Sequence, residues 1–182
     1  MSLHRLSIAL LLSLGANSVT AAEPVALPEG FRLQHYRAPT PERLPGATVL
    51  DSRALQVLMA VHQPLLLDVM AANRVADGEG GSRWVPATPR RHLPGSVWLP
   101  NVGYGALDPV IEQYFRRQLA RLTGGDLDRP LVFYCLRDCW MSWNAARRAL
   151  AWGHRAVFWY PDGSDGWQEA GLPLVEAVPE PL

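Results

Sequence analysis

Short runs of apolar residues alternate with amphipathic segments along most of the chain. The runs are short and continuously apolar, which predicts strands that are buried on both faces. They are residues 65–69, 96–99, 131–134 and 156–160. Apolar residues at helical spacing predict three helices, the first capped by Ser52. They span residues 52–62, 111–122 and 142–152. Strands that alternate with helices predict one α/β domain, in which a central parallel sheet has helices on both faces.

Residues 1–22 have a different pattern. Arg5 is followed by a nearly continuous apolar stretch over residues 6–14, and small residues lead to Ala22. This is the layout of a cleavable secretory signal. We therefore expect residues 1–22 to be a signal peptide, and the mature protein to be exported to a bacterial periplasm without a membrane span.

The segment between this signal and the α/β domain is rich in proline. Residues 23–46 contain five prolines and little apolar periodicity, which predicts an extended N-terminal arm that lies on the domain. The α/β domain itself is expected over residues 47–176, followed by a C-terminal tail over residues 177–182.

Composition and charge exclude several classes of function. The chain has 182 residues, of which 48% are hydrophobic and 19% charged, and this suits one globular domain. Its 17 basic residues, all Arg, balance 17 acidic ones, so no cationic surface for nucleic acid is expected. The absence of Lys from the sequence excludes a P-loop and a Schiff-base lysine. Two cysteines are too few for a disulfide scaffold or a four-cysteine zinc site.

The two cysteines lie where a strand is followed by a helix. Cys135 comes directly after the strand over 131–134, and the loop that carries Cys139 leads to a helix expected near Ser142. Sites in parallel sheets lie beyond the carboxyl ends of the strands. Loop N–H groups and the helix dipole there lower a thiol pKa, which predicts that Cys135 is a nucleophile. Cys139 is close enough to act as its resolving partner, so these two form the predicted catalytic pair.

Other residues of this loop are candidates for substrate binding. Arg137 adds positive charge or binds an anionic group with its planar fork. Trp140 could wall a pocket or dock a partner, and Asp138 places a negative charge beside that pocket. Together with Ser142 at the expected helix start, they form the predicted substrate-binding set.

A structural disulfide and a metal site are the alternatives for the cysteine pair. A disulfide across so short a loop restricts the unfolded chain little and adds little stability, which favours a reactive role. Haem attachment is not supported because Trp140, and not His, follows Cys139. No cofactor is firmly predicted. The alternative is Cu(I), which accepts two thiolates together with a thioether such as that of Met141.

Five segments, taken in order, resemble the rhodanese-like superfamily. They are residues 65–69, 92–96, 132–135, 165–167 and 170–174. The resemblance covers about residues 47–175. Within that superfamily the chain is most similar to the exported "PQQ-dependent catabolism-associated CXXCW motif" proteins. The matching segments are residues 134–146 and, in the arm, residues 36–41 and 44–47.

The resemblance implies a rhodanese-like fold and a periplasmic protein with a redox role, associated with alcohol oxidation by quinoprotein dehydrogenases. It does not imply that this chain binds the quinone. Departures from the superfamily pattern change the expected activity. Asp138 opposes the binding of thiosulfate, and Met141 stands where the related phosphatases need Arg, so neither activity is expected. The helix start expected at Ser142 also makes the loop one residue longer than in a typical rhodanese.

We therefore predict thiol–disulfide or persulfide chemistry, in which Cys135 attacks an oxidised sulfur and Cys139 resolves the mixed species. If the protein is an enzyme, it is a rhodanese-like sulfurtransferase or a thiol–disulfide oxidoreductase. Expected partners are small sulfur species or a periplasmic redox protein, with a link to a quinoprotein alcohol dehydrogenase system. Two alternatives stay open. One is a binding module for Cu(I) or a redox cofactor, and the other is a non-catalytic accessory protein that binds a partner through its arm and Trp140.

Overall fold

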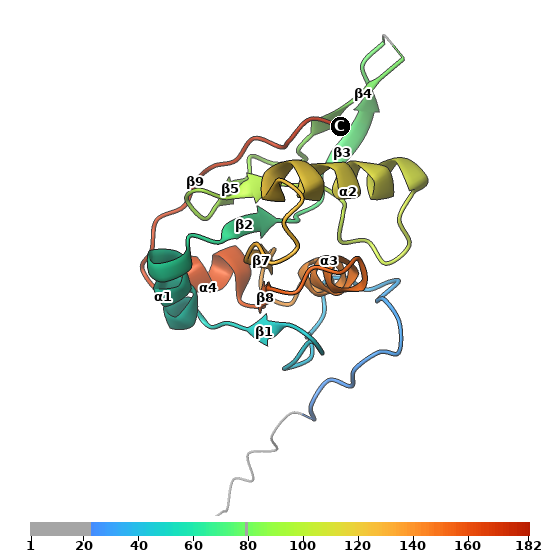
Figure 1. Cartoon of the computed structure of the whole chain (residues 1–182). Coiled ribbons are helices and arrows are strands. Elements are labelled where there is room, and N and C mark those ends of the chain that lie inside the picture. The colour runs from blue at the N-terminus through green and yellow to red at the C-terminus, as the bar shows by residue number, and fades with distance from the viewer. Residues whose placement is uncertain (1–22, 79) are drawn as a thin grey trace, which may run out of the picture.

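A five-stranded parallel sheet forms the centre of the molecule (Figure 1). The computed structural model describes residues 23–78 and 80–182, so the predicted signal peptide lies outside the described residues. The strand order is β1-β8-β7-β2-β6, and every neighbouring pair is parallel. The strands are β1 (Thr48–Val49), β2 (Leu65–Asp68), β6 (Val97–Trp98), β7 (Leu131–Tyr134) and β8 (Val157–Tyr160). The predicted parallel α/β fold is confirmed.

Helices cover both faces of this sheet, as predicted. On one face lie α1 (Ser52–His62) and α4 (Gly163–Glu169), and on the other lie α2 (Pro109–Thr123) and α3 (Trp140–Ala151) (Figure 1). Each face has its own apolar core because the side chains of a strand point alternately to opposite sides. In β7, successive side chains therefore alternate between the core under α2 and α3 and the core under α1 and α4.

The starts of all three predicted helices differ from the sequence prediction. The α2 helix begins at Pro109, two residues before the predicted residue 111. The N-cap of α1 is Asp51 rather than Ser52, and the Asp51 carboxylate accepts a hydrogen bond from the Ala54 N–H at 2.7 Å. The α3 helix begins at Trp140, two residues before the predicted start, with Cys139 as its N-cap residue. The loop between β7 and α3 is therefore shorter than predicted, and it has a cysteine at each end.

Two small antiparallel sheets and the C-terminal tail complete the fold. The small sheets pair β3 (Asn73–Ala76) with β4 (Ser82–Val85) and β5 (Arg91–His92) with β9 (Val175–Glu176). The tail then runs beside β6, where the Glu180 N–H donates to the Trp98 carbonyl at 2.9 Å. Within residues 23–78 and 80–182, no helix is long and apolar enough to cross a membrane.

The N-terminal arm runs as an extended segment beside α3 (Figure 1). Asn144 of α3 binds both backbone polar groups of Arg32. Its amide oxygen accepts from the Arg32 N–H, and its amide nitrogen donates to the Arg32 carbonyl, each at 2.9 Å. One residue earlier in α3, the Trp143 indole N–H donates to the Arg43 carbonyl at 3.3 Å. The arm is therefore fixed to the helix whose first turn follows Cys139.

Candidate functional site

The two cysteine sulfurs lie next to each other at the carboxyl end of β7. Cys135 is the first residue after the strand, and Cys139 is the N-cap residue of α3. Their sulfur atoms are 2.6 Å apart and share a hydrogen bond. Because a disulfide bond is about 2.05 Å long, a small movement of the side chains joins the two sulfurs. Both residues are buried, with exposed fractions of 0% for Cys135 and 2% for Cys139.

The surroundings shift the pKa values of the two thiols in opposite directions. The pKa of Cys139 is lowered to about 7, chiefly by its hydrogen bond with Cys135 and further by the N–H groups of Met141 and Leu136. Burial raises the pKa of Cys135 well above its ordinary value. The prediction that the pKa of Cys135 is lowered is therefore wrong. The physical reason is that the N–H groups of the loop and the first turn of α3 stabilise the Cys139 sulfur, whereas Cys135 is completely buried.

A buried ion pair lies behind Cys135. Arg90 donates from Nε and Nη2 to the Asp68 carboxylate at 2.8 and 3.1 Å. The same guanidinium reaches the Ser164 hydroxyl at 3.1 Å and the Cys135 carbonyl at 3.3 Å. Asp68 is the last residue of β2, and these contacts hold its carboxylate at the end of that strand. Arg90 and Ser164 were not predicted, because neither belongs to a periodic segment or a motif of the loop.

The start of α4 holds the backbone of Cys135. The Ser164 N–H donates to the Cys135 carbonyl at 3.0 Å. Gly163 has a φ of +57°, and a Cβ atom there would lie 2.5 Å from the same carbonyl oxygen. Only glycine allows this backbone conformation and this close approach together. Cys135 is thus held from two sides, by Arg90 and by α4.

The N-terminal arm covers the other cysteine. The Trp140 N–H donates to the Tyr36 carbonyl at 2.9 Å, and the Ala38 N–H donates to the Asp138 carbonyl at 3.0 Å, as in a short antiparallel bridge. The Trp140 indole N–H also donates to the Pro39 carbonyl at 3.1 Å. This part of the arm therefore lies along the backbone on both sides of Cys139.

Arg137 is held by acidic residues of α4 and the segment before it. Its guanidinium donates to both oxygens of Glu169 at 2.6 Å, and Asp162 lies 3.5 Å away. Its backbone N–H donates to the Asp165 carboxylate at 3.1 Å. An anionic substrate would therefore compete with carboxylates for this side chain.

The other three predicted binding residues support the cysteine loop. Trp140 is buried and packs against Trp143 with ring centroids 5.4 Å apart. The Ser142 hydroxyl donates to the Cys139 carbonyl at 3.1 Å and accepts from the Trp159 indole N–H at 3.0 Å. Asp138 has a φ of 54°, a left-handed conformation that turns its carbonyl toward the arm. Substrate binding by these residues stays a prediction.

A third sulfur lies beside the cysteine pair. Met70 follows β2, and its Sδ is 3.7 Å from the Cys135 Sγ. Met141 carries the thioether that the sequence suggested, and its carbonyl oxygen and Cβ lie against Gly103. Among the residues that the structure describes, no group of three or more His, Cys, Asp or Glu side chains could hold a metal ion.

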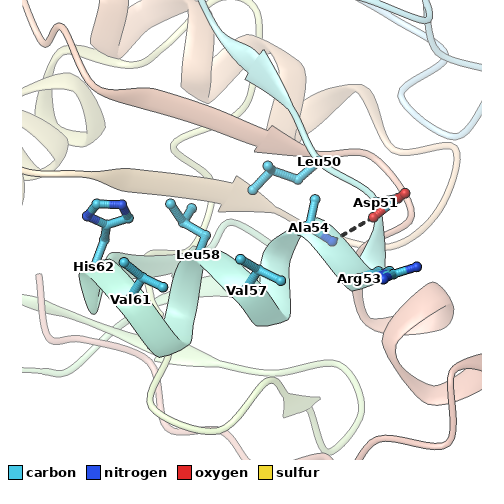
Figure 2. A pocket seen from close by; sticks show the side chains of 8 residues that line it. All are labelled: Leu50, Asp51, Arg53, Ala54, Val57, Leu58, Val61 and His62. Carbon is cyan, nitrogen blue, oxygen red and sulfur yellow. Dashed lines mark hydrogen bonds between the residues drawn. The ribbon is translucent and has the colours of Figure 1, made fainter.

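An apolar hollow lies elsewhere, along α1 (Figure 2). Its volume is about 590 Å³, and it is lined by residues of α1 and the segment before it, with no residue of the cysteine loop. Val57 and Val61 face it from α1 with exposed fractions of 58% and 66%. The hollow and the cysteine pair are therefore separate features.

A comparison with protein families identifies the family that this sequence matches. Residues 52–170 match the family described as the rhodanese-like domain. No curated protein matches this chain.

Solved structures are similar at low sequence identity. A thiosulfate sulfurtransferase from Pseudomonas aeruginosa is 17% identical, with a TM-score of 0.49; the match covers 74% of this chain but only 21% of that one. A polysulfide-sulfur transferase homodimer from Wolinella succinogenes is 16% identical, with a TM-score of 0.44 and coverage of 71% and 79%. A 3-mercaptopyruvate sulfurtransferase from Leishmania major is 16% identical, with a TM-score of 0.43 and coverage of 79% and 40%.

Proposed function

We propose, because the chain belongs to the rhodanese-like domain family, that it carries out two-thiol sulfur chemistry at Cys139 and Cys135. Family membership supports sulfur-transfer chemistry in general. The observation that carries the finer proposal is the pair of sulfurs 2.6 Å apart, of which Cys139 has a pKa of about 7. A thiol with a pKa near the ambient pH is the most effective attacking group in thiol–disulfide exchange.

The order of attack follows from the two acidities. The Cys139 thiolate attacks one sulfur of a disulfide R–S–S–R′, forms a mixed disulfide with R–S, and releases R′–S⁻. Cys135 then loses its proton, attacks the Cys139 sulfur and releases R–S⁻. The protein is left with a Cys135–Cys139 disulfide, and two electrons have passed to the substrate. This order is the reverse of the one predicted from the sequence.

The same pair of cysteines would release sulfide from a persulfide substrate. When the Cys139 thiolate accepts a sulfane sulfur from a persulfide R–S–SH, it becomes a persulfide and R–S⁻ leaves. Cys135, 2.6 Å away, is placed to attack the inner sulfur, which releases HS⁻ and leaves the internal disulfide. The geometry therefore favours reductive release of sulfide over a stored persulfide, and a reductant must then restore the two thiols.

Thiol titration with intact-mass measurement tests the proposal. The reduced protein should show two free thiols, lose both on exposure to a small disulfide, and regain both with mild reductant. Cys135→Ser should trap the mixed disulfide on Cys139, whereas Cys139→Ser should react slowly at pH 7. A Cys139→Ser variant that reacts as fast as the wild type would refute the proposed order.

Reaction with a persulfide donor distinguishes release of sulfide from storage of a persulfide on the protein. Wild-type protein should liberate one sulfide for each internal disulfide formed, and Cys135→Ser should retain the sulfur as a persulfide on Cys139. A stable persulfide on the wild-type protein would contradict the role of Cys135 as a resolving thiol.

We also propose that the protein is exported to the periplasm and acts beside PQQ-dependent alcohol oxidation. The support is the signal-like pattern of residues 1–22 and the resemblance of residues 134–146 to the CXXCW motif proteins. Cell fractionation should find a processed chain in the periplasm, and deletion of the gene should impair growth on an alcohol. Rescue by the double serine variant of the cysteines would show an accessory role without thiol chemistry, and unprocessed cytoplasmic protein would refute export.

A further inference from the structure

Three sulfur atoms from three separate segments meet at the carboxyl edge of the sheet. Met70 follows β2, Cys135 follows β7, and Cys139 begins α3. The Met70 Sδ lies 3.7 Å from the Cys135 Sγ, which in turn lies 2.6 Å from the Cys139 Sγ. The proposed exchange of disulfides uses only the two cysteines, so the thioether has no part in it.

We propose that Met70, Cys135 and Cys139 form a binding site for one Cu(I) ion. Thiolate and thioether ligands select this soft ion. Structural zinc sites take four ligands, and the described residues contain no cluster of His, Cys, Asp and Glu that would complete such a set. The donor set is therefore complete for a three-coordinate soft ion and incomplete for zinc.

The distances suit this coordination after a small movement. Three sulfurs around a metal at about 2.3 Å, the metal–sulfur length of zinc thiolates, lie about 4 Å from one another. The Met70–Cys135 separation of 3.7 Å is already close to this value. The Cys139 sulfur, now 2.6 Å from that of Cys135, has to move away by about 1.4 Å to reach this separation, which is within the reach of a χ1 adjustment.

Charged groups of both signs lie near the site. Two thiolates and one Cu(I) carry a net charge of −1. Asp68 and Arg90, which form an ion pair with each other, both interact electrostatically with Cys135, and Arg37 interacts with Cys139. Binding releases the remaining thiol protons, as a coordinating ion deprotonates its thiols, and no electron is transferred because copper stays in the +1 state.

Met70 also offers a route for the ion. Cys135 is completely buried and Cys139 is nearly so, whereas Met70 is only partly buried. Its backbone is fixed by the Trp98 indole N–H, which donates to the Met70 carbonyl at 2.7 Å, and by its own N–H, which donates to Asp68. A thioether at the rim of a buried thiolate pair is placed to accept Cu(I) first and pass it inward.

Competition for Cu(I) with a coloured chelator such as bicinchoninate, without oxygen, tests the site. Reduced wild-type protein should withdraw one Cu(I) per chain, and X-ray absorption should show a shell of sulfur ligands only. Met70→Leu should weaken binding at least about tenfold, the order of loss seen when even an outer-shell partner of a metal site is removed. Met141→Leu is the matched control and should bind as the wild type does.

Two results would overturn the proposal. One is wild-type protein that leaves all Cu(I) with the chelator, and the other is Met70→Leu that binds as tightly as the wild type while its circular dichroism is unchanged. The reduced wild-type protein should exchange its thiols with a small disulfide in the absence of copper, whatever the outcome of the copper titration. Failure of the copper site and failure of the proposed thiol chemistry are therefore separate outcomes.

Discussion

Removal of the Cys135 sulfur should raise the pKa of Cys139. The hydrogen bond between the two sulfurs is the largest cause that lowers this pKa from 9.0 to about 7. At pH 7 a group with a pKa of about 7 is half ionised, whereas one with a pKa of 9.0 is about 1% ionised. The N–H groups of Met141 and Leu136 remain in Cys135→Ala. The thiolate fraction at pH 7 should therefore fall, by about 50-fold if the pKa returns fully to 9.0 and by less if the N–H groups keep part of the shift.

Alkylation measured as a function of pH gives this pKa directly. Each rate is divided by the plateau rate of the same variant at high pH, because this ratio cancels any change in how well the arm covers the sulfur. Cys135→Ser is the matched control, since its hydroxyl can still donate a hydrogen bond and should keep part of the shift. A pKa near 7 in Cys135→Ala would show that the backbone N–H groups alone set the acidity and would refute the role given to the sulfur pair.

Three further substitutions test the supports of the site. Trp140→Phe removes the indole hydrogen bond to the arm, so alkylation of the thiolate should be faster and the free energy of unfolding lower by about 1 kcal/mol; an unchanged alkylation rate would show that the arm does not control access. Arg90→Met leaves a buried carboxylate without its partner, so denaturation in urea should show a loss of about 3–5 kcal/mol, and a loss below about 1 kcal/mol would contradict a buried pair. Gly163→Ala places a Cβ 2.5 Å from the Cys135 carbonyl oxygen, whereas Gly171→Ala has a positive φ but open space. The melting temperature should therefore fall further for Gly163→Ala, and equal values would mean that the contact with Cys135 carries no cost.

Four strands of the central sheet, β2, β6, β7 and β8, were predictable because their signal is local, whereas β1 and the four strands of the small sheets were not predicted. The runs over 65–69, 131–134 and 156–160 are continuously apolar, and a strand buried on both faces requires this pattern. The start of α3 was not predictable in this way. Its N-cap residue, Cys139, makes no side-chain capping hydrogen bond, and the Trp140 N–H is satisfied by the Tyr36 carbonyl of the distant arm. No neighbouring residue marks that helix start.

The residues that contact the cysteine pair were also not predictable from the local sequence. Cys135 and Cys139 were found from their spacing in one loop, because a short loop between a strand and a helix keeps its two ends close. Arg90 and Met70 come from other segments and reach Cys135 only through the sheet and the turns beside it. The acidities were misjudged for a related reason. The sequence places both thiols near a helix start, but only the folded chain shows which sulfur receives the N–H groups.

The backbone N–H groups of this loop decide which substrates suit the site. A loop that leads into a helix is a ready anion site when its N–H groups are free. Here the Leu136 and Met141 N–H groups stabilise the Cys139 sulfur, the Arg137 N–H binds a carboxylate, and the Trp140 N–H binds the arm. A small dianion such as thiosulfate would have to displace the protein's own thiolate from two of these donors. A neutral disulfide carries no charge that needs those N–H groups. Because they are already bound within the protein, they disfavour thiosulfate but still permit the proposed thiol–disulfide exchange at Cys139.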